Sequence, residues 1–189
     1  QMIAKGLHFP NVTLVGVVYA DLSLHMPDFR AGERTFQLLA QVAGRAGRGE
    51  VSGEVIVQTY TPFHVAVQMA KRIDFEGFAD QEIEFRREMK YPPFAHLVCL
   101  TIKGNSESEV AFFSANIAKQ LKQALEGKAA VSDAVPAPIA KARGAYRYQV
   151  VMRCTSVKAM TGPMREILSS FKFPRRMDCA VDVDALSLM

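Results

Sequence analysis

The stretch Tyr91-Pro92-Pro93-Phe94 decides how the fold of this 189-residue chain is organised, because the order of predicted elements differs on its two sides. Consecutive prolines cannot continue a helix, since proline lacks a backbone N–H and disfavours helical geometry in the residue before it. A chain of this length is long enough for one or two domains. We therefore expect a boundary here, with one domain over residues 1–90 and another over residues 91–189.

Downstream of this stretch, the hydrophobic pattern predicts six elements in the order β-α-β-β-α-β. The strands are expected over residues 95–103, 134–142, 145–155 and 177–183, and the helices over residues 107–125 and 157–170. This order is typical of the ferredoxin-like α+β fold, in which two helices cover one face of an antiparallel sheet.

Upstream of it, the pattern predicts a parallel α/β unit. Residues 12–20 (VTLVGVVYA) are rich in β-branched side chains without alternation, which favours a strand buried on both faces. A helix is predicted over residues 33–46, ended by Gly47 and Gly49, and a second strand over residues 53–60. The strand-helix-strand order indicates parallel pairing. Two amphipathic helices, over residues 64–72 and 74–90, complete this part.

Composition excludes several classes of protein. With 49% hydrophobic and 22% charged residues, the chain is typical of a globular protein. Its longest apolar run, residues 12–20, is too short to span a bilayer, so no membrane partner is expected. Its three cysteines lack CxxC spacing, which predicts neither a disulfide framework nor a zinc site and fits a reducing cytoplasm.

The positive charge is concentrated toward the carboxy terminus. Residues 1–128 hold 14 basic and 14 acidic side chains, whereas residues 139–176 hold nine basic side chains against Glu166 alone. This asymmetry indicates a polyanionic partner for the carboxy-terminal part. The alternative is a solvated basic face without a partner.

The run Gln41-Val-Ala-Gly44-Arg45-Ala-Gly47-Arg48 is a candidate catalytic motif. On a helix, positions 41, 45 and 48 share a face, and the two glycines, each costing roughly 1 kcal/mol relative to alanine, would let another surface approach. Two arginines on a rigid element suit the charge of a transferring phosphoryl group. A helix end with basic residues and glycine caps explains the same run equally well.

A second candidate site is the predicted strand around Tyr146. With a period of two, Arg143, Arg147 and Gln149 share one face with Arg153, whereas Tyr146 and Tyr148 lie on the other and are expected in the core. The basic face suits phosphates or an acidic peptide. Its alternative is a solvated sheet face.

Taken together, these motifs carry a resemblance to a known family. The run from Gln41 to Arg48 resembles motif VI of superfamily 2 helicases, and residues 1–10 (QMIAKGLHFP) resemble their motif V in the form used by the primosomal protein N′ family, the PriA-type replication-restart DNA helicases. Further matching stretches are residues 19–21, 27–31, 33–38, 53–60, 91–94, 138–141, 146–149 and 181–184. The resemblance covers essentially the whole chain and implies a carboxy-terminal fragment.

For residues 1–90, the resemblance implies the second half of the second RecA-like helicase lobe. Gly6, Gln41, Arg45 and Arg48 would bind ATP, with Arg45 and Arg48 catalytic, and Lys5 would lie near a DNA phosphate. Neither a GxxxxGK[ST] run nor a DExH run is present, so we expect the phosphate-binding loop and the Mg²⁺ ligands in a missing amino-terminal part. The fragment alone is therefore expected to be inactive. Zinc is expected in the full-length protein only.

For residues 91–189, the resemblance implies a DNA-binding domain similar to ribosomal protein S10. Its expected DNA-binding residues are Lys141, Arg143, Arg147 and Gln149. Expected partners are branched and single-stranded DNA, the acidic tail of single-stranded DNA-binding protein, and other primosome proteins. Many family members carry a basic residue where this chain has Ala145, which weakens the expectation for the acidic tail.

The implied function is ATP-dependent 3′-to-5′ unwinding by a bacterial, cytoplasmic and nucleoid-associated helicase. It would recognise stalled or branched replication forks and restart replication by loading the primosome. Two alternatives stay open: a non-enzymatic nucleic-acid-binding module, and another superfamily 2 fork helicase. The Tyr91-Pro-Pro-Phe94 junction followed by an S10-like domain argues against the latter.

Overall fold

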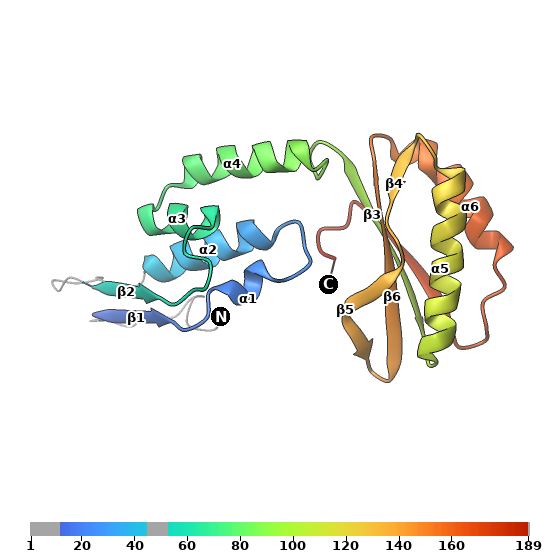
Figure 1. Ribbon diagram of the computed structural model, residues 1–189, viewed down its shortest axis with the longest axis horizontal. Coiled ribbons are helices and arrows are strands. Elements are labelled where there is room, and N and C mark those ends of the chain that lie inside the picture. Colours follow the sequence, from blue (N-terminus) through green and yellow to red (C-terminus); the bar gives the residue numbers. More distant parts are fainter. Residues whose placement is uncertain (1–11, 45–52, 189) are drawn as a thin grey trace. The chain divides into compact units, whose positions relative to one another are not determined.

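The computed structural model describes residues 12–44 and 53–188 of the chain (Figure 1). The chain divides into two compact units, a first unit over residues 1–85 and a second unit over residues 86–189. The first contains a parallel two-stranded sheet and the second an antiparallel five-stranded sheet, so the fold is mixed α/β. Among the described residues, no helix is long and apolar enough to cross a membrane.

The first unit contains the predicted strand-helix-strand arrangement. Strand β1 (Leu14–Val17) pairs in parallel with β2 (Glu54–Val57), and between them lie α1 (Asp21–Leu24) and α2 (Ala31–Ala43). Helices α3 (Val65–Arg72) and α4 (Phe75–Glu88) follow. The apolar core forms where α2 meets the helices after it, and the rings of Phe36 and Phe78 stack with their centroids 4.3 Å apart.

Two predictions for the first unit are wrong. The first strand is not buried on both faces: Val17 and Val57 pack against the helical core, whereas Leu14 and Ile56 on the other face are 57% and 53% exposed. The reason is that helices cover only one face of the described two-stranded sheet. The predicted helix 33–46 also differs from α2, which spans Ala31–Ala43 with Gly44 as its C-cap.

The second unit confirms the predicted antiparallel sheet. Strand β3 (His96–Gly104) pairs on one side with β6 (Ala145–Cys154) and on the other with β7 (Asp178–Val183). Beyond β6 lie β4 (Ala129–Val131), which was not predicted, and β5 (Val135–Ala142). Helices α5 (Glu107–Ala124) and α6 (Val157–Ser170) both lie on the same side of this sheet, as Figure 1 shows.

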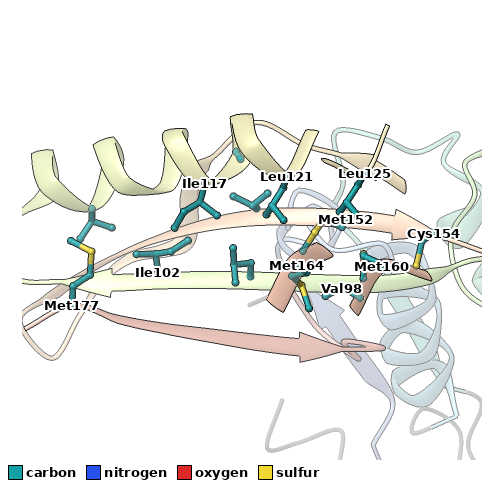
Figure 2. Packing of buried hydrophobic residues seen from close by; sticks show 14 residues of the cluster. Val98, Ile102, Ile117, Leu121, Leu125, Met152, Cys154, Met160, Met164 and Met177 are labelled. Atoms are coloured by element: carbon teal, nitrogen blue, oxygen red, sulfur yellow. The ribbon is translucent and has the colours of Figure 1, made fainter. Parts of the chain in front are cut away.

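The core of the second unit follows from the alternation of strand side chains. Val98 and Ile102 of β3 share a face with Met152 of β6, and all three are fully buried. Ile117 and Leu121 of α5 pack onto this face, together with Met160 and Met164 of α6 (Figure 2). Residues of both helices thus fill one apolar layer over the two central strands.

Serine caps set the beginnings of both helices. The hydroxyl of Ser106 accepts from the backbone N–H of Glu109 at 3.5 Å, and that of Ser156 accepts from Ala159 at 3.4 Å. Each hydroxyl satisfies one backbone donor that the first helical turn leaves without a partner. Both helices therefore start within a few residues of the strands that precede them.

A buried carboxylate ties the two parallel strands together beyond their carboxyl ends. Asp21, fully buried, follows β1 and accepts hydrogen bonds from Thr59 Oγ1 at 2.8 Å and from the backbone N–H groups of Tyr60 and Thr61 at 3.0 and 3.1 Å. The hydroxyl of Thr61 donates to the same carboxylate. This last bond is the main cause that holds the pKa of Asp21 well below its usual range, and burial opposes it.

We predict that Asp21→Asn lowers the thermal midpoint of the first unit at neutral pH, because an amide nitrogen cannot accept the bonds that the second carboxylate oxygen accepts. A carboxyl group with a lowered pKa in the folded state stabilises the fold above its unfolded pKa and loses this effect as the pH falls. Thermal unfolding followed from pH 6 to pH 3 should show the wild type losing more stability than the variant. Parallel pH profiles would contradict this role of Asp21.

Candidate nucleic-acid interface

Four of the predicted motor residues, Lys5, Gly6, Arg45 and Arg48, lie outside the described residues. Gln41 is exposed in the last turn of α2. Helix α2 ends at Ala43, and positions 45 and 48, which were predicted to share a helical face with Gln41, lie outside the described residues. The arginine-finger hypothesis therefore rests on the sequence motif.

The turn between β5 and β6 exposes a basic residue at its tip. Ala142 pairs with Ala145, and the two residues between them, Arg143 and Gly144, have φ angles of 50° and 82°. Two successive left-handed residues give the tight hairpin turn that matches the twist of the flanking strands. The prediction that Arg143 shares a strand face with Arg147 is wrong, because β6 begins at Ala145 and the side chain of Arg143 leaves from the turn.

Lys141 lies on the tyrosine side of the hairpin. It pairs in register with Tyr146, its Nζ donates to the Tyr146 hydroxyl at 3.1 Å, and the ammonium lies 4.4 Å from the centre of that ring. Tyr148 packs against the helical core as predicted. Tyr146 is half-buried near the turn, and the ammonium of Lys141 contacts both its ring and its hydroxyl.

The predicted basic stripe on β6 divides into residues with different environments. Arg147 is half-buried near the hairpin end of the strand, and Gln149 is only 5% exposed. At the far end, Arg153 donates from Nη1 to the carbonyl of Met89 at 2.6 Å and lies 5.3 Å from the ring centre of Tyr91. Arg153 thus holds the segment before β3 against the sheet, and Gln149 has little surface to offer a phosphate.

Lys103 is a neighbour of the site that sequence reasoning missed. It pairs with Arg147 across β3 and β6 and with Asp178 across β3 and β7, and its Nζ lies 3.3 Å from the carboxylate of Asp178. The alternation of the strand places Lys103 on the polar face of β3, but its position opposite Arg147 follows from the register in the structure. The exposed cations of the hairpin and this ion pair therefore share one end of the sheet, called here the basic end.

The chemistry of the basic end is that of anion binding. Guanidinium groups present paired donors that match phosphate oxygens. Because arginine is always protonated, it can bind an anion without taking up a proton. The cysteines offer no alternative chemistry, because burial raises the pKa of the thiols of Cys99, Cys154 and Cys179, the last to about 11. These thiols stay protonated near neutral pH and are poor nucleophiles.

Comparison with known proteins gives consistent matches. The family model for the primosomal protein N C-terminal domain matches residues 87–186. The replication restart protein PriA of Bacillus subtilis (strain 168) is 45% identical over 172 residues, which cover 91% of this chain and 21% of that protein. Its counterpart in Synechocystis sp. (strain ATCC 27184 / PCC 6803 / Kazusa) is 39% identical over 188 residues, or 100% of this chain and 22% of that protein.

A third relative extends the range of organisms. The replication restart protein PriA of Treponema pallidum (strain Nichols) is 37% identical over 191 residues, covering 100% of this chain and 29% of that protein. The chain thus spans between 21% and 29% of the length of these three relatives. The match of the family model covers more than half of the chain. The chain therefore belongs to the primosomal protein N C-terminal domain family.

Proposed function

We propose that the chain acts as the carboxy-terminal part of an ATP-dependent 3′-to-5′ DNA helicase that recognises stalled or branched replication forks and restarts replication by loading the primosome. The observation that carries the proposal is the 45% identity, over 91% of the chain, to a protein named for replication restart. The basic end of the second unit adds a surface with the chemistry that DNA binding requires.

Within this proposal, residues 1–90 are the second half of the second RecA-like lobe. The parallel pairing of β1 with β2, with α2 between them in sequence, supports this reading. Gly6, Gln41, Arg45 and Arg48 serve the ATP site, and Lys5 serves the DNA. The phosphate-binding loop and the Mg²⁺ ligands belong to the rest of the protein, as does zinc, so these 189 residues alone do not turn over ATP.

The second unit, an S10-like domain in this proposal, binds branched and single-stranded DNA through Lys141, Arg143 and Arg147. Contacts to phosphates fix position without reading sequence, which suits a protein that must act at forks of any sequence. Gln149 contributes to this surface only if the residues that bury it move aside. Single-stranded DNA-binding protein and other primosome proteins are the proposed protein partners, and the bacterial cytoplasm near the nucleoid is the proposed location.

The double variant Arg143→Ala/Arg147→Ala should weaken binding of the chain to forked and single-stranded DNA without changing sequence preference. Each lost phosphate contact flattens the slope of log affinity against log salt by roughly 0.7 to 0.9, so the slope should change by about 1.5. A salt titration by fluorescence anisotropy measures it. Lys119→Ala/Lys128→Ala removes two exposed lysines elsewhere on the second unit and serves as the control. If Arg143→Ala/Arg147→Ala has the same slope as the wild type, the hairpin is a solvated surface that does not contact DNA phosphates.

In the complete protein, Arg48→Ala should abolish DNA-stimulated ATP hydrolysis while ATP binding is retained. An arginine that stabilises the transferring phosphoryl group is worth roughly 10³ to 10⁵ in rate, so a steady-state ATPase assay suffices. Arg72→Ala, which removes an exposed arginine at the end of α3, is the matched control and should hydrolyse ATP normally. Near-normal turnover in Arg48→Ala would remove this residue from the ATP site. No DNA-stimulated hydrolysis by the complete wild-type protein would favour the non-enzymatic binding module.

A further inference from the structure

A second basic segment reaches the same end of the sheet as the hairpin. Residues 171–177 (FKFPRRM) connect α6 to β7, with their apolar side chains partly or fully buried and their basic side chains exposed. The rings of Phe171 and Phe173 lie 6.5 and 6.1 Å from that of Phe113 on α5, and Met177 is buried. The exposed side chains of this segment are Lys172, Arg175 and Arg176.

The backbone of this segment lies directly against the end of β3. A Cβ placed on Gly104 would lie 3.6 Å from the carbonyl oxygen of Arg176, an ordinary contact distance, and 2.9 Å from Val110 Cγ2, where the valine would have to shift. The N–H of Met177 donates to the carbonyl of Pro174 at 2.9 Å and closes a turn just before β7. The aromatic anchors and the turn together fix where the two arginines emerge.

The hairpin and this segment flank β3 from opposite sides. Lys103 pairs with Arg147 on β6 and with Asp178 on β7, so Arg147 and the residues before Asp178 lie on either side of one central strand. Two strand spacings of about 4.8 Å separate them by roughly 10 Å. That distance lies between the widths of the minor and major grooves of B-DNA, roughly 6 and 12 Å.

The cations at this end are free to bind an anion. In the part of the chain that the structure describes, none of the five outer basic residues has a carboxylate within 4.0 Å. These are Arg143, Arg147, Lys172, Arg175 and Arg176. The opposing charges nearby are Asp178, which pairs with Lys103, Asp182 on the same face of β7, and Glu107 and Glu109 in the first turn of α5. Positive charge therefore exceeds negative charge at the basic end.

We propose that residues 171–177 are the second arm of a two-armed site for the phosphate backbone of double-stranded nucleic acid, with the hairpin of residues 141–147 as the first arm. The inference rests on the proposed function, in that the same end of the sheet binds DNA, and adds Lys172, Arg175, Arg176 and a preference for duplex. Two basic arms held apart by a rigid strand contact phosphates of both strands across a groove. A single strand engages one arm at a time.

The test compares Lys172→Gln/Arg175→Gln/Arg176→Gln with the control Lys119→Gln/Lys128→Gln/Lys158→Gln, which removes the same charge from exposed positions elsewhere on the second unit. The probes are a 20-base-pair duplex and one of its strands, titrated with salt against the whole chain. At roughly 0.9 per phosphate contact on duplex, the first variant should flatten the duplex slope by about two to three units. The slope for the single strand should change by less than one unit.

The charge-retaining variant Arg175→Lys/Arg176→Lys should keep most of the duplex slope, which separates lost charge from lost folding. If the glutamine variant matches its control while Arg143→Ala/Arg147→Ala weakens binding, the second arm is overturned and the proposed function stands. If neither variant weakens DNA binding, the basic end does not bind DNA. Equal losses on duplex and single strand, or a loss confined to a poly-glutamate peptide used as a third probe, would overturn the duplex site.

Discussion

The antiparallel register between β3 and β6 is the constraint on which the rest of the second unit depends. Strand side chains alternate, so a slip of one residue would turn Val98, Leu100 and Ile102 away from the helices and bring polar side chains into the core. The helices α5 and α6, packed over Val150 and Met152 as well, oppose any such slip. Burial of one apolar face thus excludes pairings that are displaced by one residue.

That register also determines where the charges lie. Once Ile102 faces Tyr148, Lys103 must face Arg147, and Gly104 must stand beside Tyr146 and the tip of the hairpin. The same strand pairs with β7 on its other edge, which brings the segment before β7 to the same end of the sheet. Basic residues spread over more than thirty positions of sequence therefore converge, although no local sequence motif joins them. At the opposite end, Arg153 is engaged with Met89 and Tyr91.

For the second unit, sequence patterns predicted the helices and strands better than the pairing and burial of individual surface residues. The bounds of α6 agree at both ends, because the cap at Ser156 and the apolar positions at Met160 and Met164 are local signals. The shift in pairing between Pro136 and Lys141 of β5 was not predictable, since it depends on the strand that β5 meets. The burial of Gln149 has the same origin, because its neighbours come from β3 and β5. In the first unit, apolar density alone overstated burial, and the C-cap of α2 is Gly44.

Hydrogen–deuterium exchange of the whole chain, with and without the 20-base-pair duplex, would locate the DNA-binding surface most directly. If phosphates bind at the basic end, added duplex should slow exchange in peptides that cover residues 139–149 and 171–177. Peptides that cover residues 125–131 and 155–160, at the opposite end of the sheet, should exchange at the same rate in both samples. Protection confined to that opposite end, or found in neither pair of segments, would show that this sheet end does not hold the DNA.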